Sequence, residues 1–223
     1  MANHIAVITG DIIDSRRLTD SRRLHGLLES TLTGLAERYA GGYQRYRGDG
    51  FQLALDRAEA ALDAAVAIRA ALIAHSEPGH RWDARLAVAI GQDTWRPGDA
   101  LASADGPAFI ASGRALDALS EGDAHLTLSH NEAPDAPCQA LLLRHLDALI
   151  DGWSPRAAEV VVLRLEGDLT QQALAERLGI RQPSVHKRLR AAHWGLLADS
   201  LAHFRDTLGG TGHTPPAQED TTP

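Results

Sequence analysis

The sequence IAVITGDIIDS at residues 5–15 and the sequence RYRGDGFQLAL at residues 45–55 decide the fold of this chain. The first is an apolar, β-branched run that stops at a Gly-Asp pair, which predicts a buried strand with the carboxylate of Asp11 at its C-terminal end. The second predicts a β-hairpin, because a Gly-Asp-Gly turn centred on Asp49 separates two strand-like runs. If these strands are neighbours in one sheet, Asp11 and Asp49 meet at one point.

Paired carboxylates of this kind suit a magnesium ion that also contacts a phosphate. Mg²⁺ is usually held by one or two carboxylates together with phosphate oxygens of a substrate. Gly48 and Gly50 flank Asp49, and their lack of a side chain would let the backbone approach a phosphate. We therefore interpret Asp11 and Asp49 as metal ligands. The residues alone leave an alternative open, in which Asp11 caps a turn and Asp49 is an ordinary hairpin residue.

The first 130 residues predict an α+β domain. Around the hairpin, apolar spacing alternates between the helical and the strand period. The resulting order of strand, helix, hairpin, helix and strand is that of the ferredoxin-like βαββαβ fold. Besides the first strand and the hairpin, the predicted elements are helices at residues 18–39, 58–75 and 106–119 and strands at residues 84–90 and 125–129.

The remainder of the chain predicts a second, all-α domain. Residues 131–137 hold two prolines and two acids, which predicts a linker. Residues 138–208 show helical periodicity throughout, including one long helix from Gln182 to Phe204. Residues 209–223 are rich in Gly, Pro and Thr, and we predict that they form a disordered tail.

Residues 170–189 carry the pattern of a helix-turn-helix. Ala175 is small where two helices must cross closely, and Gly179 sits where the turn needs a positive φ. Pro183 fits the first turn of the second helix, whose N-terminal half would meet the bases and phosphates of DNA. The segment resembles region 4 of sigma factors, and a helical bundle used for protein contacts is the alternative. The predicted DNA-binding residues are Arg181, Gln182, Ser184, His186, Lys187 and Arg190.

Charge and cysteine content limit which partners and which cellular compartment are expected for this chain. The chain has a net charge of −7, but residues 154–205 carry 8 Lys and Arg against 5 acids, so the basic excess lies where DNA binding is predicted. The single cysteine, Cys138, cannot form an internal disulfide. No apolar run approaches membrane-spanning length. We therefore expect a cytoplasmic protein that does not interact with membranes.

Gly10-Asp11-Ile12, followed by Ser15-Arg16 and later by Gly48-Asp49-Gly50-Phe51-Gln52, resembles the palm domain of nucleotidyl cyclases and GGDEF-type diguanylate cyclases, and more closely that of the SatD family. The resemblance covers about residues 4–130. It implies a palm that binds a nucleotide with Mg²⁺, with the carbonyl of Ile12 as a further metal ligand. The residues that it places at the nucleotide are Ser15, Arg16, Arg45, Gly48, Gly50 and Arg114.

The chain departs from the cyclase pattern in the helix at residues 106–119. Arg114 matches a cyclase arginine, but Ile110 stands where cyclases carry an asparagine and Pro107 where they carry a purine-selecting acid. In the hairpin, Arg45 occupies the position of the purine-selecting lysine. These departures favour a site that binds a nucleotide without turning it over.

Three hypotheses for function follow. The leading one is a bacterial, homodimeric, DNA-binding transcriptional regulator whose palm senses a nucleotide with Mg²⁺. The alternative is an active metal-dependent nucleotidyl transferase or cyclase whose helical domain serves dimerisation. A protein-interaction scaffold with neither ligand is the third. Whether the chain is an enzyme stays open at this point, because the first two hypotheses use the same pair of aspartates.

Overall fold

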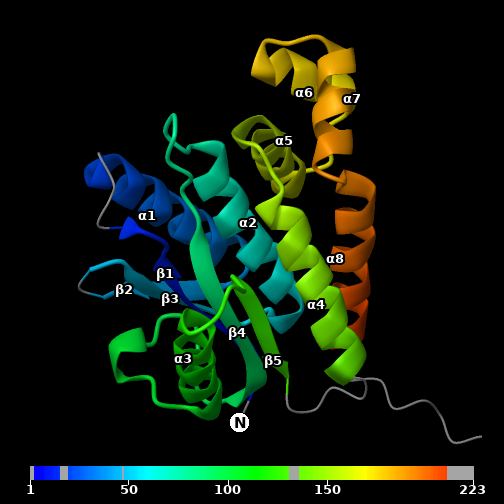
Figure 1. The fold of residues 1–223 in the computed structure, drawn as a ribbon. Helices are drawn as coiled ribbons and strands as arrows, with labels where there is room; N and C mark the ends of the chain where they lie inside the picture. Colours follow the sequence, from blue (N-terminus) through cyan, green and yellow to red (C-terminus); the bar gives the residue numbers. More distant parts are fainter. Residues whose placement is uncertain (1–2, 16–19, 47, 131–135, 210–223) are drawn as a thin grey trace, which may run out of the picture.

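The structure is a computed structural model that describes residues 3–15, 20–46, 48–130 and 136–209. A five-stranded sheet in the order β2-β3-β1-β4-β5 lies at its centre, with helices on both faces (Figure 1). The strands are β1 (Asn3–Ile12), β2 (Gly41–Arg45), β3 (Gly50–Leu55), β4 (Ala84–Asp93) and β5 (Leu126–His130). The helices are α1 (Ser21–Arg38), α2 (Ala61–Ala74), α3 (Pro107–Ser120), α4 (Ala136–Asp151), α5 (Pro155–Glu166), α6 (Gln171–Leu178), α7 (Gln182–Ala191) and α8 (Trp194–Gly209), with short 3₁₀ turns η2 (Ala58–Ala60) and η3 (Leu101–Ser103).

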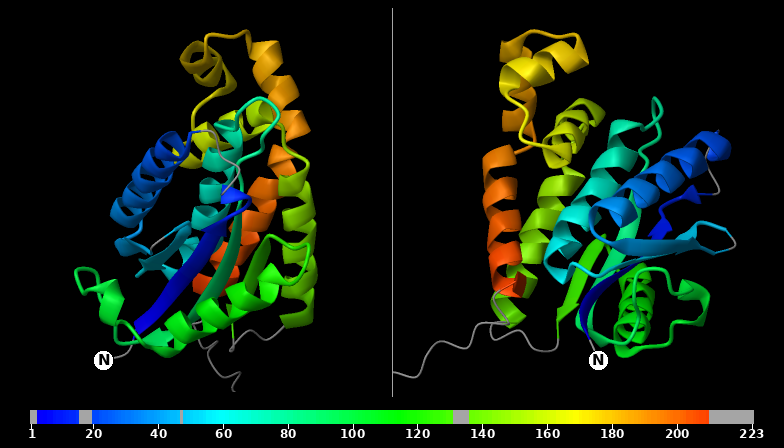
Figure 2. Two further views of the ribbon diagram at one scale, coloured as in Figure 1. Left: turned by 60° about the vertical axis from the view of Figure 1, so that its left-hand side comes forward. Right: turned by 180° about the vertical axis from the view of Figure 1, so that it is seen from behind.

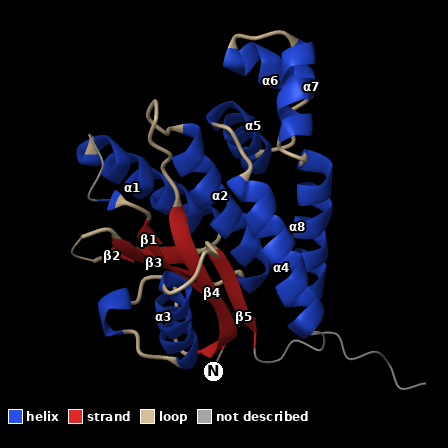
Figure 3. Cartoon of the chain, in the orientation of Figure 1, coloured by secondary structure: helices blue, strands red, loops and turns tan. Residues whose placement is uncertain are grey.

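The central strand, β1, carries the first half of the motif into the middle of the sheet. It pairs antiparallel with β3 on one side and with β4 on the other, and β5 extends the sheet by parallel pairing with β4. In this register Asp11 lies opposite both Gly50 and Arg85. The mixed α+β class predicted from the sequence is confirmed, and its strands all lie in one sheet (Figure 3).

Alternation along β1 sends its side chains into two cores. Ile8 and Ile12 are buried in the large core that also includes α1 and α2, whereas Val7 packs with Phe109 of α3 on the opposite face. Because successive side chains of a strand point to opposite faces, Asp11 lies on the α3 face of the sheet. The candidate site is therefore separated by the sheet from the large core.

Three of the helices after residue 135, α4, α5 and α8, share that large core with the sheet domain, which we define as residues 3–130. Trp153, Val161 and Phe204 belong to the same buried cluster as Leu62 of α2. α5 packs on α2, α4 on β5 and α8 on η2, and both views of Figure 2 show these helices stacked along one side of the sheet domain. α4 begins at Ala136, inside the predicted linker, while residues 131–135 and all but the first residue of the predicted tail lie outside the described residues.

A buried ion network also joins the sheet domain to α4. Arg69 of α2 has no exposed surface, and its guanidinium donates to Asp83 at 2.8 Å and to Asp147 and Asp151 of α4 at 2.6 Å each. Buried charges are tolerated when they are fully paired in this way. The network therefore ties the position of α4 to the sheet domain.

The predicted single helix from Gln182 to Phe204 is wrong. α7 ends at Ala191 and α8 begins at Trp194, because His193 takes a left-handed backbone conformation with φ of 51°. The carbonyl of Ala192 accepts a hydrogen bond from the indole of Trp153 at 3.2 Å. This contact holds the chain at the break between the two helices.

The break changes which apolar residues are available for a dimer contact. From the sequence, the predicted long helix offers five apolar residues to a partner subunit; of these Leu196 is 58% exposed, but the others are buried against this chain itself: Leu189, Leu197, Leu201 and Phe204. Nothing else in the described residues tests the predicted homodimer. None of the helices described is both long and apolar enough to cross a bilayer.

Candidate functional site

Asp11 lies on the α3 face of the sheet, and Asp49 is near enough for its charge to act on the Asp11 carboxyl. Asp11 is near the C-terminal end of β1, and Asp49 lies in the turn between β2 and β3. Gly48 makes this turn possible by taking φ of 96°, a conformation that favours glycine. The hydroxyl of Ser15, just beyond β1, donates a hydrogen bond to Asp49 Oδ2. The predicted carboxylate pair and the predicted Ser15 are thus neighbours.

The two oxygens of Asp11 have different surroundings. Oδ2 accepts a hydrogen bond from Arg85 of β4 at 3.0 Å, whereas Oδ1 is buried and lacks a hydrogen-bond partner among the described residues. Burial raises the pKa of the Asp11 carboxyl above its usual 3.8; the guanidinium of Arg85 opposes the rise, and the negative charge of Asp49 adds to it. A cation beside Oδ1 would give this oxygen a partner and lower that pKa. The donor set therefore fits Mg²⁺.

The other residues predicted at the nucleotide are placed differently. Gly50 lies opposite Asp11. Arg45 lies on the other face of the sheet, because it is in register with the buried Phe51, and it forms an ion pair with Glu29 of α1 at 3.3 Å. Arg114 of α3 is exposed, Ile12 is buried, and Arg16 lies outside the described residues. The roles assigned to all of them stay predictions.

Two features of the site were missed by sequence reasoning. One is Arg85, which holds Asp11. The other is a chain of hydrogen bonds on the α3 face, from the phenol of Tyr46 to Gln52 Oε1 at 2.9 Å, from Gln52 Nε2 to Thr9 at 3.0 Å, and between the hydroxyls of Thr9 and Ser112 of α3 at 2.7 Å. The only sign of this hydrogen-bond chain in the sequence was a Thr and a Gln in strands that are otherwise mainly apolar.

No known family and no curated protein matches the sequence of this chain. Among solved structures, a bacterial light-regulated adenylyl cyclase is similar with a TM-score of 0.45 at 16% identity, over 63% of this chain and 81% of that one. An adenylate/guanylate cyclase/hydrolase from Silicibacter pomeroyi is similar with a TM-score of 0.41 at 21% identity, over 52% and 70%. The GGDEF domain of DgcB from Caulobacter crescentus, in complex with c-di-GMP, has a TM-score of 0.38 at 15% identity, over 57% and 77%.

These likenesses assign no role to any residue of this chain. The three similar structures are nucleotide cyclases and a GGDEF domain. The resemblances to the SatD family and to sigma region 4 stay predictions.

The segment predicted to bind DNA forms a pair of helices at one end of the molecule (Figure 1). α6 and α7 are joined at Gly179, which has φ of 63°, and Leu174 and Val185 are buried in a small core that these two helices share with Val160 and Leu163 of α5. Six side chains of the second helix and its start are exposed on the outside of this pair: Arg181, Gln182, Ser184, His186, Lys187 and Arg190.

A second group with metal-ligand chemistry lies at the contact with α4. Ligand atoms of Asp83, His125 and Asp151 lie within 4.8 Å of one another. The guanidinium of Arg69 already donates to both carboxylates, so the positive charge in this group is supplied by the protein. The pair at Asp11 and Asp49 is therefore the better candidate for a metal ion.

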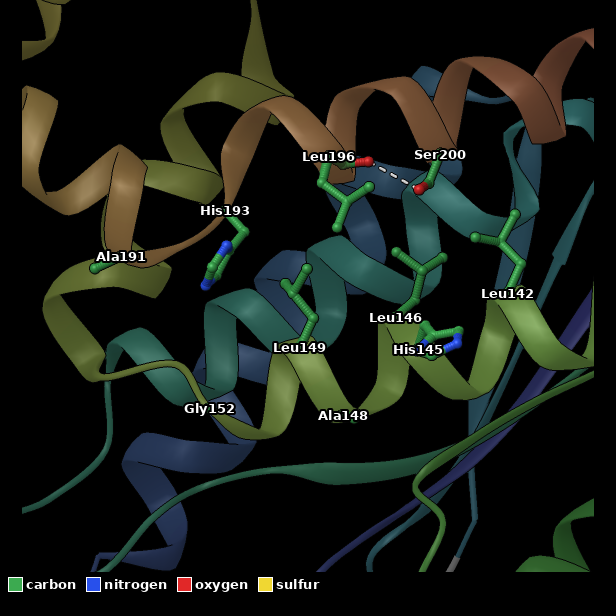
Figure 4. A pocket seen from close by; sticks show the side chains of 10 residues that line it. All are labelled: Leu142, His145, Leu146, Ala148, Leu149, Gly152, Ala191, His193, Leu196 and Ser200. Carbon is green, nitrogen blue, oxygen red and sulfur yellow. Dashed lines mark hydrogen bonds between the residues drawn. The ribbon is translucent and has the colours of Figure 1, made fainter.

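A further hollow of about 500 Å³ lies between α4 and α8 (Figure 4). Four of the ten residues that line it are leucines, including Leu149 and Leu196, and His193 points into it from the break between α7 and α8. No other observation in the described residues indicates what would cover it.

Proposed function

We propose that this chain binds a nucleoside triphosphate together with Mg²⁺ at Asp11 and Asp49, as the site of a nucleotidyl transferase or cyclase. The observation that carries the proposal is Asp11 Oδ1, which is buried beside a second carboxylate and has no hydrogen-bond partner in the part of the chain that the structure describes. Leaving such an oxygen unsatisfied costs on the order of 1–3 kcal/mol. A bound divalent cation would remove that cost.

The surrounding residues are arranged to hold the two ligands in place. Arg85 fixes one oxygen of Asp11, and Ser15 fixes one oxygen of Asp49. Gly48 and Gly50 leave the turn without side chains next to the aspartates, so that phosphates can approach the backbone. When bound, Mg²⁺ neutralises phosphate charge and orients the triphosphate for attack at its α-phosphate, with pyrophosphate as the leaving group.

We favour an enzyme over a sensor for this site because the enzyme requires only the groups just described. The regulator hypothesis also requires that a second surface bind DNA. Arg114 is exposed on α3, and Ile110 one turn before it is 47% exposed where cyclases carry an asparagine. The reaction therefore has to proceed without that asparagine.

Product analysis tests the proposal. The full chain is incubated with each of the four labelled nucleoside triphosphates and Mg²⁺ or Mn²⁺, and we expect pyrophosphate together with a cyclic or oligonucleotide product. Asp49→Asn should abolish product, while the matched control Asp123→Asn, an exposed aspartate in the turn before β5, should not. Metal-dependent nucleotide binding without any product would instead support the hypothesis that the site is a sensor. Absence of binding would refute the site.

DNA binding through α7 is a second candidate, favoured by one observation. Arg181, Lys187 and Arg190 are exposed on α7 or at its start, and none of them has an ion-pair partner among the described residues, whereas Arg188 pairs with Glu159 at 2.5 Å. Exposed, unpaired cations on a helix that projects from the body suit phosphates of a duplex. Selection of genomic fragments by the full chain, with and without nucleotide and Mg²⁺, tests it; failure to enrich any fragment would refute it.

A further inference from the structure

The hydrogen-bond chain on the α3 face has a fixed direction. Ser112 has one hydroxyl hydrogen, which it donates to the carbonyl of Phe109 at 3.0 Å. Between Thr9 and Ser112 the donor must therefore be Thr9. With its own hydrogen committed, Thr9 can only accept from Gln52, which turns the amide nitrogen of Gln52 toward Thr9 and its oxygen toward Tyr46.

This direction determines what the phenol of Tyr46 can offer to a ligand. The amide oxygen of Gln52 has no hydrogen, so Tyr46 must be the donor in the 2.9 Å contact between them. A phenol has one hydrogen and also accepts hydrogen bonds through its lone pairs. Once that hydrogen is used inside the protein, the oxygen of Tyr46 is left as an acceptor only.

Tyr46 lies beside the metal site and is open to solvent. Its backbone N–H donates to the carbonyl of Gly50 at 2.9 Å, and Gly50 is the residue opposite Asp11. Gly50 has no side chain to stand between Tyr46 and Asp11. Tyr46 is 44% exposed, and its bond to Gln52 places its phenol on the α3 face, which is the face of Asp11.

We propose that Tyr46 determines which nucleotide this site accepts, by taking a hydrogen bond from a donor group of the nucleotide, either a sugar hydroxyl or an exocyclic amine of the base. The inference rests on the proposed function, because it concerns the ligand of the same site. A ligand that lacks the donor would leave the phenol oxygen without its partner. One neutral hydrogen bond corresponds to roughly tenfold in affinity.

Affinity measurements on the full chain with Mg²⁺ separate the two sources of the donor. The probes are ATP and GTP, their 2′-deoxy and 3′-deoxy forms, and ITP, which has no exocyclic amine. The test variant is Tyr46→Phe. The matched control is Tyr43→Phe, which removes a phenol hydroxyl from β2 on the other face of the sheet, where it contacts Thr33 at 2.9 Å.

In the wild type we expect about tenfold weaker binding of the probe that lacks the donor. Tyr46→Phe should bind that probe and its parent nucleotide equally, while Tyr43→Phe should discriminate like the wild type. Ser112→Ala, which frees the hydrogen of Thr9 and lets the amide of Gln52 turn, should also reduce the discrimination although Ser112 is buried away from the ligand.

Three outcomes would overturn the inference. The first is that the wild type binds every probe and its parent nucleotide equally. The second is that Tyr46→Phe discriminates between them as the wild type does. The third is that Tyr46→Phe loses the same affinity for every probe, which a structural role would produce. Failure of the wild type to bind any of the nucleotides would instead refute the proposed function, so the two failures are distinguishable.

Discussion

Asp63 of α2 makes the contact between the sheet domain and α8 dependent on pH. Its side chain is buried, its Oδ1 accepts a hydrogen bond from Arg205 of α8 at 2.5 Å, and its Oδ2 has no hydrogen-bond partner among the described residues. Burial raises the pKa of Asp63 from 3.8 to about 6, and Arg205 opposes that rise only in part. At neutral pH the Asp63 carboxyl is therefore ionised, although its protonated form is the more stable one in this buried position.

The effect on stability follows from the difference in proton binding between the folded and unfolded chains. Because the pKa is higher in the folded state, the contribution of Asp63 is fully present below about pH 4 and is lost as the pH rises through about 6. A rise in pKa from 3.8 to about 6 corresponds to about 3 kcal/mol at most. Asp63→Asn cannot ionise and should escape this loss.

Urea unfolding followed by circular dichroism at several values between about pH 4 and pH 7 measures the effect. Relative to the wild type, Asp63→Asn should gain in free energy of unfolding as the pH rises, by up to about 3 kcal/mol. Asp199→Asn, which changes an exposed aspartate of α8, is the matched control and should show no such trend. A difference between Asp63→Asn and the wild type that stays constant, or that falls with rising pH, would refute the reasoning.

Four other variants test further parts of the structure. Arg69→Leu leaves the buried carboxylate of Asp147 without its cation, although Asp83 keeps Arg81 at 3.1 Å, and should lower the free energy of unfolding by about 3–5 kcal/mol in urea titrations. A loss below about 1 kcal/mol would contradict the described network. Arg85→Ala should raise the pKa of Asp11 further, so that Mg²⁺ binding is half lost at a higher pH than in the wild type, as followed by calorimetry. Lys187→Ala and Arg190→Ala should weaken binding to all DNA sequences and flatten its salt dependence in electrophoretic shifts, and an unchanged salt slope would argue against phosphate contacts.

Local sequence chemistry was sufficient to predict the order of the elements along the sheet domain and to single out the two aspartates. The Gly-Asp-Gly turn fixes a hairpin because Gly48 can take a positive φ. The apolar run before Asp11 defines the central strand, and the order of elements then leaves few topologies. Gly179 predicted the turn between α6 and α7 in the same way.

Contacts between distant elements could not be predicted in this manner. Arg85 belongs to a strand, β4, whose sequence is otherwise that of an ordinary strand. Nothing in the sequence of β4 shows that it pairs with β1 beside Asp11. The break at His193 has no glycine or proline at the residue that takes the positive φ. The amphipathic faces of α5 and α8 indicate that they are buried but do not indicate that the sheet domain covers them.

The same limit explains the placement of Arg45. Its position in the hairpin was aligned with a nucleotide contact, but the face of a strand depends on register, and a shift of one residue reverses it. In the structure Arg45 is in register with Phe51 and lies toward α1. Arg45→Ala should therefore leave nucleotide affinity unchanged if this placement holds in the bound state.

Calorimetric titration of nucleoside triphosphates into the full chain, with Mg²⁺ and with EDTA, tests the central claim most directly. We expect saturable binding of at least one nucleotide to the wild type only in the presence of Mg²⁺, and loss of that binding in both Asp11→Asn and Asp49→Asn. Circular dichroism should show that both variants remain folded, because neither aspartate belongs to the hydrophobic cores. Binding that survives in both variants, or that is indifferent to Mg²⁺, would contradict the assignment of Asp11 and Asp49 as metal ligands.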